Sequence, residues 1–175
     1  MHSMTIKEVI CALERFAPLP LQADYDNAGL QVGLTEVEVS GALLCLDVTP
    51  AIIDEAVEKQ CNLVVAHHPL IFHKLNRIAD ENEVQCVVRK AIEQHVVVYA
   101  MHTNIDSARG GVNFKIAEKL GLTQMQFFGH QQTVDGVDGG DGIIGEYPTP
   151  LAADDFVLQL KRQFDVECVQ CNALL

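Results

Sequence analysis

Two adjacent histidines lie where an apolar segment of the chain ends, and their type and spacing suit metal chemistry. His67 and His68 follow the apolar residues 63–66, and a second apolar segment is followed by His102 and Asp106. Imidazole and carboxylate groups are usual ligands of zinc, iron, manganese and nickel ions. If both segments are strands whose ends meet, these side chains predict a metal-centred site.

The adjacency of the two histidines bears on how many ions such a site would hold. Side chains that follow one another in a regular strand point in opposite directions, so His67 and His68 could not share one ion there. The backbone is expected to leave extended geometry before Pro69, so that each histidine serves a different ion and a carboxylate bridges the two. That arrangement suits a two-metal site in which a bridging water becomes a nucleophile. The residues alone leave another interpretation open, a polar turn at the histidines with His102 and Asp106 as a capping pair.

Apolar segments alternate with helical patterns along most of the chain. Strands are predicted at 30–32, 42–46, 63–66 and 95–101, and helices at 5–16, 50–57, 84–92 and 112–120. This alternation predicts an α/β fold with a largely parallel or mixed sheet flanked by helices. In such sheets ligands bind beyond the carboxyl ends of the strands, which is where both candidate segments lie.

The sequence divides into three parts. Residues 1–130 are predicted to form the domain that carries the metal site. Residues 131–142 are polar and rich in glycine and aspartate, and this composition predicts a mobile loop or a boundary. Residues 143–175 are predicted to begin a further α/β segment, apparently truncated, with a strand at 143–147 and a helix that includes 156–164.

Two turn-rich segments have both a functional and a structural interpretation. Gly110 and Gly111 precede a predicted helix, whose free amides together with Arg109 could bind an anion. A tight turn that needs glycine is favoured instead, because the longer spacing of a phosphate-binding loop is missing. Asp26 and Asn27 could line a pocket or build their own turn, and the turn is favoured.

The composition narrows the classes of function. An apolar fraction of 49% is enough for a packed core. There is no apolar run that could span a membrane and no apparent secretory signal, so a cytoplasmic protein is predicted. The formal net charge of −12 disfavours nucleic-acid binding and requires metal or a local basic pocket near any anionic substrate. Cys168 and Cys171 are interpreted as a chance CxxC pair, because no second ligand pair lies close in sequence.

Five segments in order resemble one known family. These are residues 24–33, 46–49, 66–72, 102–106 and 110–113. Together they are similar to the Nif-three-like family, whose bacterial members are often labelled GTP cyclohydrolase 1 type 2 homologues. The resemblance covers nearly the whole chain. It implies a dinuclear metal site in an α/β fold, displayed within a ring-like homo-oligomer that is often a hexamer.

The resemblance also implies roles for individual residues. His67, His68 and Asp106 would be the metal ligands. His102 would lie beside the metals, as a further ligand or as a group that orients one, and is the catalytic candidate. Two divalent ions (Zn, Fe, Mn or Ni) would activate a water as hydroxide for attack on a small substrate, such as a nucleotide. The alternative is a non-catalytic, metal-stabilised scaffold or regulatory interaction protein.

The sequence departs from the family at its end. Members of the family continue to a His and a Glu four residues apart, which complete the two-metal site, and nothing here matches them. The 175 residues are therefore interpreted as part of a longer protein. This chain carries about half of the implied ligands, and it is expected to hold metal less well than the complete site.

Overall fold

The computed structural model describes residues 3–172, and the order of its elements as far as residue 100 follows the sequence pattern. The helices are α1 (Ile6–Phe16), α2 (Pro50–Glu58), α3 (Glu83–Glu93), α4 (Thr103–Ser107), α5 (Val112–Leu120) and α6 (Ala153–Phe164), with a short 3-10 turn, η1, at Leu19–Leu21. The strands are β1 (Gly29–Val32), β2 (Ala42–Cys45), β3 (Leu63–Ala66), β4 (Val97–Ala100), β5 (Thr123–Val134) and β6 (Val137–Glu146).

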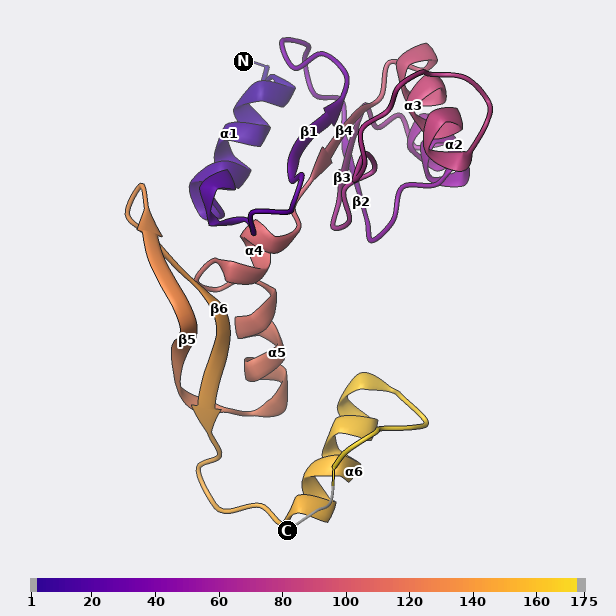
Figure 1. Ribbon diagram of the computed structural model, residues 1–175. Helices are drawn as coiled ribbons and strands as arrows, with labels where there is room; N and C mark the ends of the chain where they lie inside the picture. Colours follow the sequence, from indigo (N-terminus) through magenta and orange to yellow (C-terminus); the bar gives the residue numbers. More distant parts are fainter. Residues whose placement is uncertain (1–2, 173–175) are drawn as a thin grey trace.

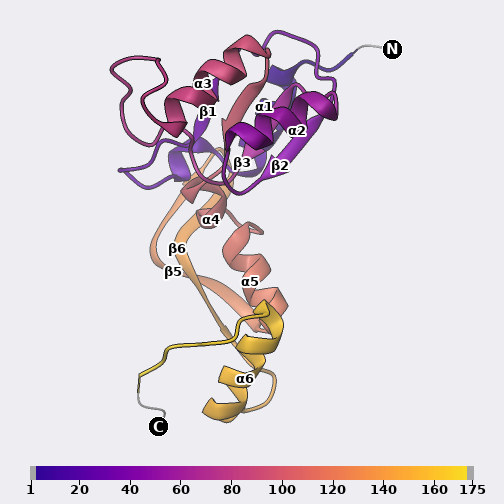
Figure 2. The same ribbon diagram turned by 90° about the vertical axis from the view of Figure 1, so that its right-hand side faces the viewer.

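The first four strands form one sheet in the order β1-β4-β3-β2. β2, β3 and β4 run parallel, whereas β1 pairs antiparallel with β4 at the edge. The prediction of an α/β fold with a largely parallel or mixed sheet is therefore confirmed. Figures 1 and 2 show α1 on one face of this sheet and α2 and α3 on the other.

The two faces of the sheet carry separate apolar cores, and this explains the unbroken apolar runs of the central strands. Every residue of β3 and β4 is buried. Val64 and Val98 face α2 and α3, whereas Val65 and Tyr99 face α1. A strand covered on both faces needs apolar residues at every position, which is the pattern that predicted these two strands.

Capping residues fix where the flanking helices begin. The Thr5 hydroxyl accepts a hydrogen bond from the Glu8 amide, and the Glu8 carboxylate accepts one from the Thr5 amide at 2.7 Å, which is the reciprocal pattern of a capping box. At the start of α2, directly before Pro50, the Thr49 hydroxyl accepts a single hydrogen bond from the Ile52 amide. In residues 3–172 no helix is both long and apolar enough to cross a membrane.

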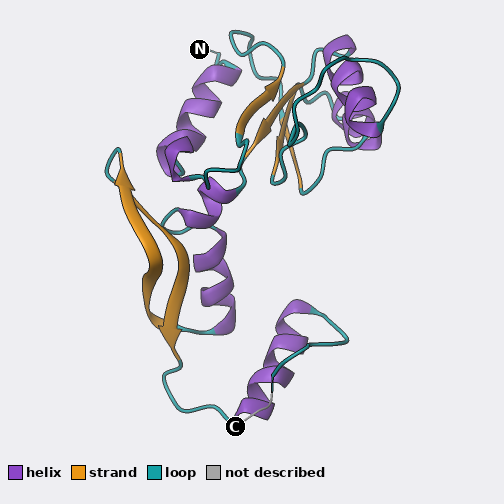
Figure 3. Cartoon of the chain, viewed as in Figure 1, coloured by secondary structure: helices purple, strands orange, loops and turns teal. Residues whose placement is uncertain are grey.

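The predicted loop at 131–142 is wrong, because these residues lie in β5 and β6 and in the turn between them (Figure 3). Asp135 and Gly136 make the two-residue turn with φ angles of 51° and 81°, a backbone conformation that favours a hairpin. A Cβ atom at Gly139 would lie 2.7 Å from Leu21 Cδ2, so the glycine permits close packing rather than mobility. Residues 143–146 are the end of β6, while the assignment of 143–175 to a further segment stays a prediction.

The connection between α4 and α5 is a tight turn, as the double glycine indicated. Gly110 has a φ of +78°, and a Cβ atom at Gly111 would lie only 1.8 Å from the Ile105 carbonyl oxygen. The Gly111 amide donates to the Ala108 carbonyl at 3.0 Å, which closes the turn. Glycine is therefore required here by backbone packing.

Candidate metal centre

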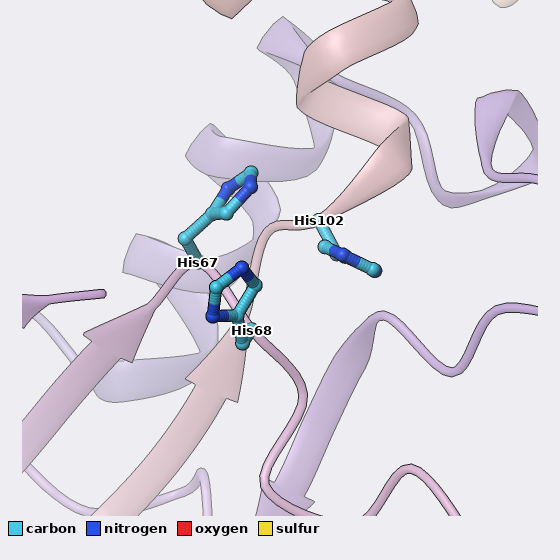
Figure 4. Close-up of side chains that lie close together, drawn as sticks. All are labelled: His67, His68 and His102. Carbon is cyan, nitrogen blue, oxygen red and sulfur yellow. The ribbon is translucent and has the colours of Figure 1, made fainter. Parts of the chain in front are cut away.

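The histidines predicted from sequence converge at the carboxyl edge of the sheet. Ala66 at the end of β3 pairs in register with Ala100 at the end of β4, so the residues that follow both strands emerge at the same edge. His67 and His68 follow β3, and His102 follows β4 at the start of α4. Figure 4 shows the three imidazoles gathered at this point.

The three rings are close enough to share bound metal. Their centroids are 5.0 Å apart for His67 and His68, 5.2 Å for His67 and His102, and 5.6 Å for His68 and His102. One ring nitrogen from each histidine lies within 4.8 Å of the others. Nitrogen ligands surround an ion at about 2 Å each, so a cluster of this size could bind a metal ion.

Asp106 brings a carboxylate to the same cluster from α4. Its Oδ1 atom lies 4.0 Å from His67 Nε2. The same oxygen is buried and accepts no hydrogen bond from any residue in 3–172. Burial raises the pKa of Asp106, although His67 and His102 oppose the rise. A buried carboxylate oxygen without a donor is costly, and a cation at the cluster would relieve that cost.

Two aspartates are hydrogen-bonded to the Nδ1 atoms of two of the imidazoles. Asp47 Oδ1 lies 2.7 Å from His68 Nδ1, and Asp26 Oδ1 lies 2.8 Å from His102 Nδ1. Because an ionised carboxylate only accepts hydrogen bonds, each Nδ1 carries the proton and donates it. In the neutral imidazole this tautomer leaves the Nε2 lone pair free, as in metal-bound histidines whose orientation is fixed by a carboxylate.

Asp26 is more deeply buried than Asp47 and accepts more hydrogen bonds. Its side chain is 0% exposed, and it accepts from the Thr103 amide at 3.1 Å, from the Thr103 hydroxyl and from the Asn27 amide at 2.7 Å. Burial works against ionisation, but the hydrogen bonds from Thr103 and His102 hold the pKa of Asp26 below its ordinary value. Asp26 therefore orients His102 and the start of α4 as a charged acceptor.

Sequence reasoning missed both aspartates as site residues. The sequence pattern favours a turn role for Asp26 and indicates no role for Asp47. The only signal was that both lie in segments that carry the family resemblance, 24–33 and 46–49. The four predicted residues, His67, His68, His102 and Asp106, do come together, and their binding of metal stays a prediction.

Replacing Asp26 by Asn is expected to weaken metal binding about tenfold while the fold is kept. The amide removes the negative charge that fixes the His102 tautomer, and it cannot accept all of the present hydrogen bonds. A competition titration with a chromophoric zinc chelator measures the affinity. Asp24→Asn is the matched control, because Asp24 is exposed and two residues away. Equal affinities for the two variants would count against a positioning role.

The sheet, its helices and the histidine cluster define an α/β protein with a candidate metal centre. The chain belongs to the Duf34/NIF3 (NGG1p interacting factor 3) family, whose model matches residues 4–174. The resemblance drawn from the five sequence segments is thereby confirmed.

Among the curated relatives, two proteins named GTP cyclohydrolase 1 type 2 homolog illustrate the similarity. The protein from Clostridium acetobutylicum is 30% identical over 168 residues, which cover 96% of this chain and 62% of the relative. The protein from Bacillus subtilis is 36% identical over 124 residues, which cover 71% of this chain and 33% of the relative. The chain thus spans less than two thirds of the length of these relatives.

Solved structures share the fold. Staphylococcus aureus hypothetical protein SA1388 superposes with a TM-score of 0.85 at 27% identity, over 97% of this chain and 67% of that protein. Reduced HcgD from Methanocaldococcus jannaschii has a TM-score of 0.75 at 26% identity, over 93% of this chain and 61% of HcgD. The described α/β arrangement is therefore the fold of the family.

Proposed function

We propose that this protein is a metal-dependent hydrolase that holds two divalent ions at the carboxyl edge of its sheet. The observation that carries the proposal is the meeting of three imidazoles beside a buried carboxylate oxygen that lacks a donor. Neutral imidazole and carboxylate together form the ligand set of Zn, Fe, Mn or Ni ions.

Each residue has a distinct part in this proposal. His67 and His68 would each hold one ion, and Asp106, whose free oxygen faces His67, would help to fix the pair. His102, oriented by Asp26, would be a further ligand or would move a proton at its Nε2 atom. Two divalent ions held by these residues would supply an activated water as the nucleophile for attack on an electrophilic carbon or phosphorus.

The substrate in this proposal is a small molecule such as a nucleotide. The names of the two curated relatives refer to GTP, which supports this class. Assembly into a ring-like homo-oligomer, a hexamer in the form that the resemblance implies, belongs to the same proposal. Multi-angle light scattering of the protein from its native gene measures the assembly directly.

Metal analysis of the protein expressed from its native gene is expected to find about two divalent ions per chain. Chelation should remove the ions together with any hydrolysis of purine nucleotides or phosphate esters, and added metal should restore both. Fewer than about one ion per chain would refute the two-metal proposal. Full metal content without turnover of any tested substrate would favour the scaffold alternative.

A further inference from the structure

A pocket of about 470 Å³ lies beside the candidate metal centre, under the loop that joins β3 to α3. Its lining includes Phe72, His73, Lys74, Arg77, Asn82 and Gln85. Most of these residues come from the loop that begins directly after His67 and His68, so one segment of chain supplies both the imidazoles and the pocket.

Phe72 connects the pocket to the metal centre. Its ring lies 6.5 Å from the His102 ring, at an interplanar angle of 88°. Its ring also lies 5.2 Å from the His73 ring. Phe72 is 42% exposed, so part of the residue is open to a ligand. A flat group packed on Phe72 would therefore touch the pocket and approach the imidazoles.

The loop is held at both ends. The Ile71 amide donates to Gln31 Oε1 of β1 at 3.0 Å. Further along, the Ala79 amide donates to Gln85 Oε1 at 3.1 Å, and Gln85 is only 5% exposed. These anchors set the backbone on either side of residues 72–77. Fixing the two ends of the segment lowers the entropic cost of ordering it around a ligand.

The charge of the pocket is opposite to that of the protein. Lys74 is exposed and has no ion pair or hydrogen bond within the described residues 3–172. Arg77 pairs with Glu81 at 3.1 Å. The three ionised side chains in the lining leave one net positive charge, in a chain whose formal net charge is −12. A local positive field in an acidic protein favours anionic ligands at this place.

We propose that this pocket binds the oxyanion of the substrate, a phosphate or carboxylate group, through Lys74, while a flat ring of the same molecule packs on Phe72. The inference rests on the proposed function and deepens it, because it names the substrate as a ring-bearing small anion. The remainder of the molecule then extends toward His102, where the reaction would take place.

Ligand-observed NMR titrations of the purified protein test the pocket with three probes that share one ring. Benzylphosphonate and phenylacetate carry the two oxyanions, and neither has an ester to hydrolyse, while benzyl alcohol is neutral. Lys74→Ala is expected to weaken binding of the preferred anion about fivefold, whereas Lys74→Arg retains it. Lys59→Ala is the control, because Lys59 is also exposed, follows the last residue of α2 and does not line the pocket.

Each outcome bears on the inference. Binding of one anion more tightly than benzyl alcohol supports the inference, and the anion that binds more tightly identifies the bound group as phosphate-like or carboxylate. Equal affinities of wild type, Lys74→Ala and Lys59→Ala, or benzyl alcohol binding as tightly as the anions, would overturn it. The titrations are repeated after chelation, where the Lys74 dependence is expected to persist without ions. If the Lys74 dependence is lost after chelation, the inference about the pocket is refuted and the proposed function is not. If the metal analysis finds no ions, the proposed function is refuted and the inference about the pocket is not.

Discussion

The His68→Ala variant is expected to bind divalent metal at least about 100-fold more weakly than the wild type. The substitution removes the His68 Nε2 atom, which is the atom available to a metal because Nδ1 bonds to Asp47. It also removes the hydrogen-bond partner that lies 2.7 Å from the Asp47 carboxylate. Loss of a group that only orients a ligand costs 10–100-fold in affinity, so loss of the ligand itself should cost at least as much. Competition against a chromophoric chelator measures the change for zinc and for manganese.

His130→Ala serves as the control for this variant. His130 is exposed on β5, and its ring is absent from the cluster of the three imidazoles. Its removal should leave metal affinity unchanged. Equal affinities for the two variants would show that the imidazole cluster does not hold the ions. The melting temperature of each variant distinguishes the hydrolase proposal from the scaffold alternative. If the metal is structural, His68→Ala should also lose the fold or the oligomer.

Gly111→Ala is expected to destabilise the protein by about 3 kcal/mol or more. The added Cβ would lie 1.8 Å from the Ile105 carbonyl oxygen and 3.0 Å from the Ala108 carbonyl oxygen. Both neighbours are backbone atoms of the α4 segment, so they cannot swing aside as a flexible side chain would. Urea unfolding followed by circular dichroism measures the free energy of unfolding.

Gly121→Ala separates steric clash from backbone strain. Gly121 closes α5 with a φ of +78°, and a Cβ atom there meets nothing within 4 Å. Its replacement should therefore cost only about 1 kcal/mol, the usual penalty for an L-residue in the left-handed region. A loss for Gly111→Ala no larger than that for Gly121→Ala would contradict the packing argument.

The sequence predicted the central strands because burial on both faces leaves a simple pattern. Val64, Val65, Val98 and Tyr99 are all buried, and an unbroken apolar run is what such strands require. Since parallel strands in register end at one edge, the meeting of His67 with His102 also followed from local pattern. The antiparallel direction of β1 could not be predicted from local pattern, because it depends on how the chain returns through the 17–28 segment.

The roles of the aspartates that orient the imidazoles could not be predicted from the local sequence pattern. Asp26 reaches His102 across 76 residues, and nothing around Asp26 distinguishes it from an ordinary turn residue. The hairpin was missed for a related reason. Most of β5 faces solvent, and Gly139 and Gly140 of β6 pack closely against Leu21 and Phe127, which no short sequence window reveals.

The attachment of α4 to the hairpin has a consequence for the candidate metal centre. Two residues beyond Asp106, Ala108 bridges Gly139 of β6, and the Arg109 amide donates to the Asp138 carbonyl at 3.0 Å. The position of the Asp106 carboxylate beside the imidazoles therefore depends on backbone contacts with a hairpin, none of whose residues belongs to the cluster of His67, His68 and His102. A side chain in place of Gly139 would push against Leu21 and the Ser107 carbonyl, and would misalign Asp106 by remote steric pressure.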